Sequence, residues 1–167
     1  MSNTGDVFAA DDLTAFNNQA LKKHNEYRLK HKVPALVLDT QLNTSAQQWA
    51  NTLASQGQFK HSGKSGVGEN LYIWMSSSPT NTNTITSEAD KAVNAWYNEI
   101  KDYNFQSPGF SSKTGHFTQV VWKSTSKLGC GIASGKYNNM YARFVVCQYT
   151  TPGNFTNAFP QNVLPPK

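Results

Sequence analysis

The chain has 167 residues, of which 38% are hydrophobic and 12% aromatic, so it can build the core of one compact domain. Its formal net charge is +5, but the lysines and arginines are scattered and no base-stacking motif accompanies them, so we expect no nucleic-acid partner. The sequence also lacks a run of about 20 apolar residues, so we predict no membrane-spanning helix and expect only weak association with anionic membrane surfaces.

The first residues are polar, and we predict a flexible segment at 1–10 followed by a single domain at 11–167. They lack the apolar core of a signal peptide, and Ser2 in place of glycine excludes N-myristoylation. Either a signal peptide has been removed from this sequence, or the protein does not enter the secretory route.

Three amphipathic segments in the N-terminal two thirds of the chain predict helices. Their capping candidates are Asp11 or Asp12, Asp39 or Thr40, and Ser87. Their apolar stripes recur every three or four residues and comprise Leu13, Phe16, Ala20, His24 and Tyr27; Leu42, Ala46, Trp49, Ala50 and Leu53; and Ala89, Ala92, Val93, Trp96 and Ile100. Glu99 borders the apolar stripe of the third helix.

We expect some polar residues of the first helix to be exposed to solvent and one to be buried. Arg28, Lys30 and Lys32 form a dense basic cluster that we place on a solvated face, and His31, between two lysines, we place on the surface. His24 lies on the apolar stripe. We therefore expect His24 to be a buried, hydrogen-bonded histidine and not a ligand.

The remaining segments read as turns, strands and loops. Residues 62–68 are rich in glycine and predict a turn, 71–75 a short strand, and 76–86 an exposed loop of serine, threonine and asparagine. The run GHFTQVVW at 115–122 alternates β-branched and aromatic residues and predicts a half-buried strand, with His116, Thr118, Val120 and Trp122 on one face. Residues 104–114 and 151–167 lack periodicity and are expected to be irregular.

The two cysteines flank a predicted β-hairpin. Its strand candidates are residues 128–134 and 140–149, joined by a two-residue turn at Asn138 and Asn139. Paired positions in this register include Cys130 and Cys147 at a site where Cα atoms approach to about 4.5 Å, close enough for a disulfide. A bridge would imply an oxidising compartment, whereas two buried thiols in a reduced protein remain the alternative. Glycosylation sequons at Asn43 and Asn154 are compatible with secretion.

Helices followed by strands favour an α+β fold. Five ordered motifs then give the chain a resemblance to the CAP family of cysteine-rich secretory proteins, antigen 5 and pathogenesis-related proteins. The motifs are HNEYR at 24–28, GENL at 68–71, AWY at 95–97, GHFTQVVW at 115–122 and CQY at 147–149. Segments 96–105 and 162–167 look most like the Golgi-associated and fungal secreted branches. The resemblance implies a three-layer α–β–α sandwich around a largely antiparallel sheet.

The resemblance also implies that His61, Glu69, Glu99 and His116 line a central cleft. Two imidazoles and two carboxylates suit a divalent transition metal, so we predict a site for Zn²⁺ or a similar cation, with the carboxylates orienting the rings. A metal-dependent peptidase is an alternative, because zinc beside a glutamate can support hydrolysis. The sequence contains neither a nucleophile elbow nor an HExxH motif, and we predict no catalytic residue.

The loop at 103–110 carries a second functional prediction. Its residues Tyr103, Phe105, Pro108 and Phe110 match the aromatic spacing that is called a caveolin-binding motif in this family, and the corresponding loop is implicated in sterol binding by family members. From the residues alone, the three rings either shelter a flat apolar ligand or staple the loop to the sheet. Fatty acid binds between two helices in some members, which here would be the first and third.

These inferences together predict a secreted, extracellular CAP-domain protein that binds sterols or fatty-acid-type lipids and carries a divalent-metal cleft. The alternatives are the peptidase and a defence- or immune-modulating ligand that acts through its surface. The cytosolic face of Golgi membranes is the alternative location. The sequence leaves open both the physiological ligand and the formation of a homodimer.

Overall fold

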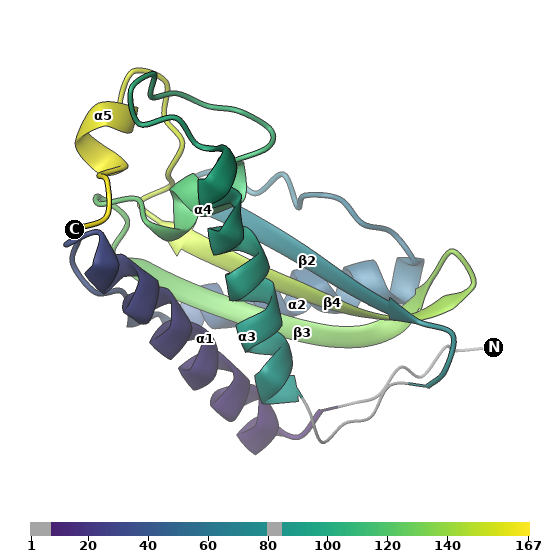
Figure 1. The fold of residues 1–167 in the computed structure, drawn as a ribbon. Coiled ribbons are helices and arrows are strands. Elements are labelled where there is room, and N and C mark those ends of the chain that lie inside the picture. The colour runs from purple at the N-terminus through teal and green to yellow at the C-terminus, as the bar shows by residue number, and fades with distance from the viewer. Residues whose placement is uncertain (1–7, 80–84) are drawn as a thin grey trace.

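The computed structural model describes residues 8–79 and 85–167. Its elements are α1 (Ala10–Lys30), β1 (Val37–Leu38), α2 (Thr40–Gln56), β2 (Gly68–Ser76), α3 (Ile85–Tyr97), the 3-10 helix η2 (Asn98–Asp102), α4 (Gly115–Val120), β3 (Lys127–Tyr137), β4 (Met140–Thr150) and α5 (Phe159–Asn162). The four strands form one sheet in the order β1-β3-β4-β2, antiparallel except for the β1–β3 pair. Helices α1 and α3 cover one face and α2 covers the other (Figure 1). The predicted α–β–α sandwich is confirmed.

The start of the chain differs from the predicted flexible segment. Residues 1–7 of that segment lie outside the described residues, but Phe8 is only 9% exposed, belongs to the core and lies under the guanidinium of Arg143. Helix α1 begins at Ala10, so Asp11 and Asp12 lie in its first turn and do not cap it. The Phe8 ring packs the residues just before the helix against the core, and the charges of the acidic pair favour the positive end of the helix dipole.

The other helix starts give one confirmation and one correction. Asp39 caps α2 as predicted, since its side chain accepts a hydrogen bond from the backbone N–H of Leu42 at 2.9 Å. The predicted cap at Ser87 is wrong because α3 already begins at Ile85, whose buried side chain extends the apolar stripe by one turn. The predicted exposed loop therefore ends before Ile85, and its residues 80–84 lie outside the described residues.

The hairpin and its bridge are confirmed. Strands β3 and β4 pair in the predicted register, and Asn138 and Asn139 both have positive φ (50° and 64°), which is typical of the two-residue turn that matches strand twist. Cys130 lies directly opposite Cys147 with the Cα atoms 4.1 Å apart, and the two residues form a disulfide. Both cysteines are buried in the core.

Helix α2 lies very close to β3 because the strand has glycine where the helix crosses it. A Cβ atom at Gly129, Gly131 or Gly135 would clash with the helix. The nearest helix atoms would be Asn43 N, Gln47 Cα and Ala54 O, at 2.2, 2.4 and 2.4 Å. No side chain fits in that space, so each glycine is required by packing.

The edge of β3 beyond β1 is completed by side chains. Strand β1 pairs only with Lys127 and Leu128. Further along, the carboxamide of Asn17 donates to Cys130 O and accepts from Cys130 N–H, both at 2.9 Å. The carboxamide of Gln47 does the same for Ile132, at 2.8 and 3.1 Å. Each amide thus forms the two hydrogen bonds that a neighbouring strand would form.

Arg28, predicted on a solvated face, is fully buried. Its guanidinium donates hydrogen bonds of 2.8–3.0 Å to four backbone carbonyls, those of Pro34, Val120, Trp122 and Thr125. A guanidinium has several N–H donors and suits carbonyls that the end of a helix leaves unpaired. Arg28 therefore ties α1 to the C-terminal end of α4.

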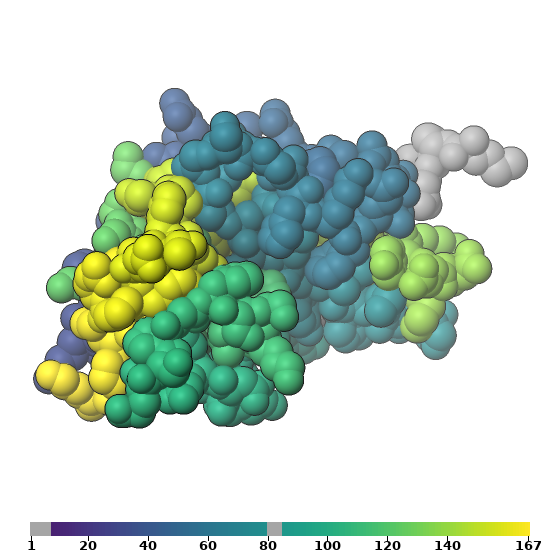
Figure 2. Space-filling model, turned by 90° about the horizontal axis from the view of Figure 1, so that it is seen from above, coloured from purple at the N-terminus to yellow at the C-terminus, as the bar shows by residue number. Residues whose placement is uncertain are grey.

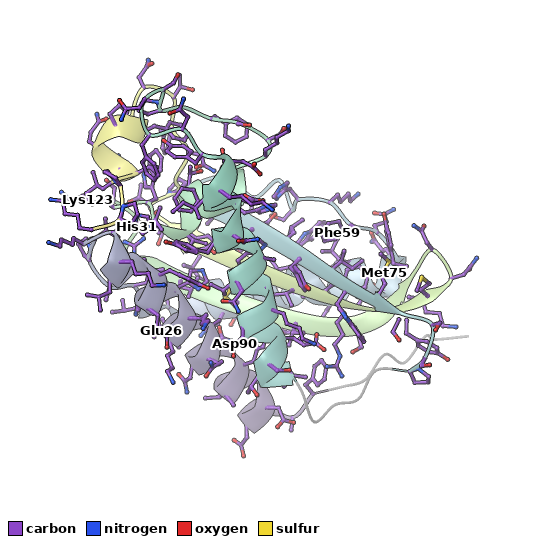
Figure 3. The ribbon with its side chains drawn as sticks, viewed as in Figure 1. Glu26, His31, Phe59, Met75, Asp90 and Lys123 are labelled. Carbon is purple, nitrogen blue, oxygen red and sulfur yellow. A yellow bond between two sulfur atoms is a disulfide. The ribbon has the colours of Figure 1, made fainter. Side chains whose placement is uncertain are left out.

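Two histidines of the first helical region lie in the core. His24 is buried as predicted, with Nδ1 2.7 Å from Ala20 O and Nε2 2.7 Å from the hydroxyl of Tyr149. His31, predicted on the surface, is instead 1% exposed, because the C-terminal segment crosses the end of α1 and supplies Leu164 O to its Nδ1. Figure 3 shows His31 at this end of the helix. No helix in the described part of the chain is long and apolar enough to cross a membrane.

Candidate functional site

A cleft of about 240 Å³ opens where the turn before β2, the loop before α4 and the C-terminal segment come together. These three segments meet on the face that Figure 2 shows in blue, green and yellow. The cleft is lined by His61, Glu69, Asn70, Phe110, Ser112, Gly115, His116 and Asn154. Glu99, on η2, contacts His116 from outside this lining. Three of the four predicted metal-site residues thus line one cleft, and the fourth, Glu99, contacts one of them.

The motif that carries His116 is a helix, and the predicted strand at 115–122 is wrong. Glu99 explains the difference, because its Oε1 accepts the backbone N–H groups of His116 and Phe117 at 3.0 and 3.1 Å. These are two of the donors that the start of a helix leaves unpaired. All residues from Phe117 to Val120 are buried, so no amphipathic period marks the helix in the sequence.

Glu99 also fixes the imidazole of His116. Its Oε2 lies 2.8 Å from Nδ1 of His116, and the ring stacks near Trp96 with centroids 6.2 Å apart. A carboxylate only accepts hydrogen bonds, so Nδ1 carries the proton and Nε2 is left with its lone pair. The His116 side chain is 35% exposed at the cleft, and no described residue forms a hydrogen bond with its Nε2.

His61 and Glu69 form a second pair of the same construction. Nδ1 of His61 lies 2.9 Å from Glu69 Oε1, and the histidine side chain is 63% exposed while the glutamate side chain is 7% exposed. The hydrogen bond to Glu69 raises the pKa of His61 against the opposing effect of burial. Burial acts to raise the pKa of Glu69, but hydrogen bonds from His61, Gln148 and Ser62 outweigh it and lower this pKa.

The two carboxylates are occupied by donors of the protein itself. Glu69 accepts four hydrogen bonds, from His61 Nδ1, the Ser62 amide and hydroxyl, and Gln148 Nε2. Glu99 accepts three. Among the described residues no group of three or more His, Cys, Asp or Glu side chains converges as a metal cluster. The donor set that faces the cleft therefore consists of two imidazole Nε2 atoms, each oriented by a carboxylate.

The three rings of the loop at 103–110 differ in how they pack. Tyr103 and Phe105 form an edge-to-face pair with centroids 4.8 Å apart and pack on Phe117, so they staple the loop to the core. Phe110 is 64% exposed and lines the cleft, where its ring lies against Gly115, and Pro108 is exposed at the turn. Tyr103 and Phe105 therefore serve at least to staple the loop, and Phe110 is the most exposed of the three rings.

Two asparagines of the cleft were missed as site residues. Asn70 donates to His116 O at 3.1 Å, which holds the start of α4 against β2. Asn154, the first residue of a sequon, has a left-handed backbone (φ 63°), accepts from the Thr118 hydroxyl and donates to Gly115 O. Its carboxamide is part of the cleft wall. Its position after Pro152 and Gly153 is a turn signal that could have indicated this role.

An α–β–α sandwich with paired histidines and glutamates at one cleft defines a CAP-domain protein. The family model described as the Cysteine-rich secretory protein family matches residues 21–149, and the chain belongs to this family. It is 49% identical to the human Golgi-associated plant pathogenesis-related protein 1, over 91% of this chain and 94% of that protein. It is 37% identical to Secreted protein RBT4 of Candida albicans, over 92% of this chain and 42% of that protein. It also matches the crystal structure of NaASP2 with Zn²⁺, with 25% identity, a TM-score of 0.63, and coverage of 89% of this chain and 83% of that one.

Proposed function

We propose that this CAP-domain protein binds a divalent cation, Zn²⁺ in the first place, through Nε2 of His61 and Nε2 of His116. The observation that supports this proposal is the repeated construction of the two pairs, in which a carboxylate holds Nδ1–H and leaves Nε2 free at the cleft. The similar protein NaASP2 was crystallised with Zn²⁺. A bound cation supplies a fixed positive charge that can anchor an electron-rich group of a ligand.

We propose binding and not hydrolysis as the role of this cleft. A general base needs a carboxylate oxygen that can take a proton from water. The four hydrogen bonds that Glu69 accepts fill its acceptor positions. Glu99 accepts three and does not belong to the lining of the cleft, where a water would have to be activated. Peptide hydrolysis that requires Zn²⁺ and disappears in His116→Ala would overturn this assignment in favour of a peptidase.

Calorimetry with Zn²⁺ tests the metal site. We expect the His61→Ala/His116→Ala double variant to lose measurable Zn²⁺ binding. Ser112→Ala is the matched control, because Ser112 lines the same cleft but is not one of the proposed ligands. Equal Zn²⁺ affinity of the wild type and the double variant would remove the proposal.

We further propose that the loop binds a sterol or related lipid through Phe110, and not through three rings acting together. The 64% exposure of the Phe110 ring supports this, since burial of apolar area contributes about 25 cal/mol per Å². Phe110→Ala should weaken cholesterol binding, while the control Phe59→Ala should not. Phe59 is also exposed, but it contacts Tyr137 at the hairpin end of the sheet and does not line the cleft. Cholesterol affinity unaffected by Phe110→Ala would refute the loop hypothesis.

We propose an extracellular location, because a buried disulfide forms in oxidising compartments. The names of the relatives include both a secreted and a Golgi-associated protein. Titration of thiols in denatured, unreduced protein from its native source should find none. Two titratable thiols would favour the cytosolic face of Golgi membranes instead.

If the protein binds neither the metal nor the lipid, the remaining alternative is a defence- or immune-modulating ligand that acts through its surface.

A further inference from the structure

A second hollow, the α1–α2 groove, lies between these two helices beyond the end of β1. Its volume is about 350 Å³, larger than that of the cleft. It is lined by Leu13, Thr14, Asn17, Leu38, Asn43, Thr44, Gln47, Gln48 and Cys130, none of which lines the cleft. A volume of this size is in the range of small-molecule sites.

The walls of this groove are held in place by the packing of the sheet. Asn17 and Gln47 are each fixed by hydrogen bonds in both directions to the edge of β3. Helix α2 cannot move closer to the sheet, because its backbone already contacts Gly129 and Gly131. The groove is therefore formed by the fold itself and does not depend on a mobile loop.

The chemistry of the lining is uncharged throughout. All nine side chains are apolar, hydroxyl-bearing, carboxamide or disulfide groups. The carboxamides of Asn17 and Gln47 are used by the strand. Oδ1 of Asn43, in contrast, is shielded from solvent and has no hydrogen-bond partner among the described residues. A buried acceptor without a donor is an unfilled position.

We propose that the α1–α2 groove binds a small uncharged ligand that carries one hydroxyl or amide N–H group on a short apolar body. The hydroxyl or N–H group of the ligand donates a hydrogen bond to Oδ1 of Asn43. This oxygen faces the ligand once the carboxamide turns about the Cβ–Cγ bond, a torsion that has broad minima in asparagine. The apolar body lies against Leu13 and Leu38. A charged ligand is disfavoured, because no lining residue offers an opposite charge.

Three ligands of equal chain length test the proposal on the whole chain: 1-hexanol, hexanoate and hexylammonium. Binding is followed by ¹H–¹⁵N NMR titration, which also maps the site. We expect hexanol to shift resonances of groove residues and to bind at least about tenfold more tightly than either ion, as expected when a charge is buried without a partner. Equal or tighter binding of hexanoate, or shifts confined to the cleft, would overturn the proposal.

Variants of Asn43 test the role of its oxygen. Asn43→Leu keeps the apolar volume but removes the acceptor and should weaken hexanol binding about tenfold, roughly the effect of one hydrogen bond. Gln41→Leu is the control, because Gln41 is exposed on the same helical turn and does not line the groove. Asn43→Asp keeps an acceptor, adds a negative charge and should shift the preference to hexylammonium. Unchanged hexanol affinity in Asn43→Leu, or unchanged ion selectivity in Asn43→Asp, would contradict the assignment.

Discussion

The four histidines fall into two pairs that differ in what their two ring nitrogens contact. In the core, His24 and His31 each direct Nδ1 at a backbone carbonyl, so that Nε2 accepts from the hydroxyl of Tyr149 or Tyr97. At the cleft, His61 and His116 direct Nδ1 at a carboxylate, and no described residue occupies Nε2. A histidine of this fold is thus available as a ligand when its Nε2 is unoccupied and accessible, not merely when its ring is fixed in place.

The surroundings also set opposite pKa shifts. Burial lowers the pKa of His24 to about 4 and also lowers that of His31. The neighbouring carboxylate raises the pKa of His61. The core histidines are therefore neutral structural groups, whereas His61 keeps its proton to a higher pH than an ordinary histidine.

The largest expected effect comes from deleting a core histidine. His24→Ala should lower the free energy of unfolding by about 3 kcal/mol, because it leaves a cavity and removes the acceptor of the buried Tyr149 O–H group. His61→Ala should change it by only about 0.5 kcal/mol, since this side chain is exposed. Urea unfolding measures the free energy of unfolding of both variants. Equal decreases in the two variants would contradict the division into core and cleft histidines.

The next effect is the dependence of stability on pH. Because the native pKa of His24 is about 4 and the unfolded value is near 6.5, the unfolded state binds a proton first as pH falls. Stability should therefore decrease from pH 6.5 towards 4, by up to about 3 kcal/mol. The contribution of Glu69 is lost only at still lower pH, since its native pKa is below the ordinary value of 4.5. Flat stability over this window would contradict the assignment.

A smaller effect should follow from changing the partner of a cleft histidine. In Glu99→Gln the amide oxygen can still accept the backbone N–H groups of His116 and Phe117, but the NH₂ group donates to Nδ1 and forces the ring proton onto Nε2. Zn²⁺ affinity should fall about 10–100-fold, as is usual for groups that orient ligands. Calorimetry measures this, while circular dichroism should show an unchanged fold. An unchanged affinity would mean that Glu99 only caps α4.

The smallest effect concerns the pH at which Zn²⁺ is released. A proton competes with the metal for His61, whose pKa lies above its ordinary value of 6.5. Affinity should therefore begin to fall above pH 6.5 and then drop about tenfold per pH unit for each histidine that is protonated. Titrations between pH 8 and 6 test this. A Zn²⁺ affinity that stays constant down to pH 6 would show that the His61–Glu69 pair does not determine the pH at which Zn²⁺ is released.

The features that the sequence predicted correctly depend on neighbours in the chain. Asp39 caps α2 three residues away, and the hairpin turn fixes the register that joins Cys130 to Cys147. The fold class followed from helical stripes and strand pairs of this local kind. The prediction that the four cleft residues lie close together came from the resemblance to a known family and not from their spacing in the sequence.

The features that it missed depend on distant backbone groups. Glu99 turns the run at His116 into a helix from 17 positions away, and Arg28 is buried because carbonyls 92 to 97 positions away surround its guanidinium. Neither a helical period nor a strand period records such contacts. His31 was misplaced for the same reason, since its cover comes from the far end of the chain.

The carboxamides of Asn17 and Gln47 have a consequence for the behaviour of many molecules together. An open strand edge is a template on which another chain can add, and repeated addition leads to fibrils. Here the backbone groups of Cys130 and Ile132 are already taken by side chains, so a second molecule finds nothing to pair with at these positions. Two side-chain amides thus prevent the addition of another chain at the part of the β3 edge that no strand of the fold covers.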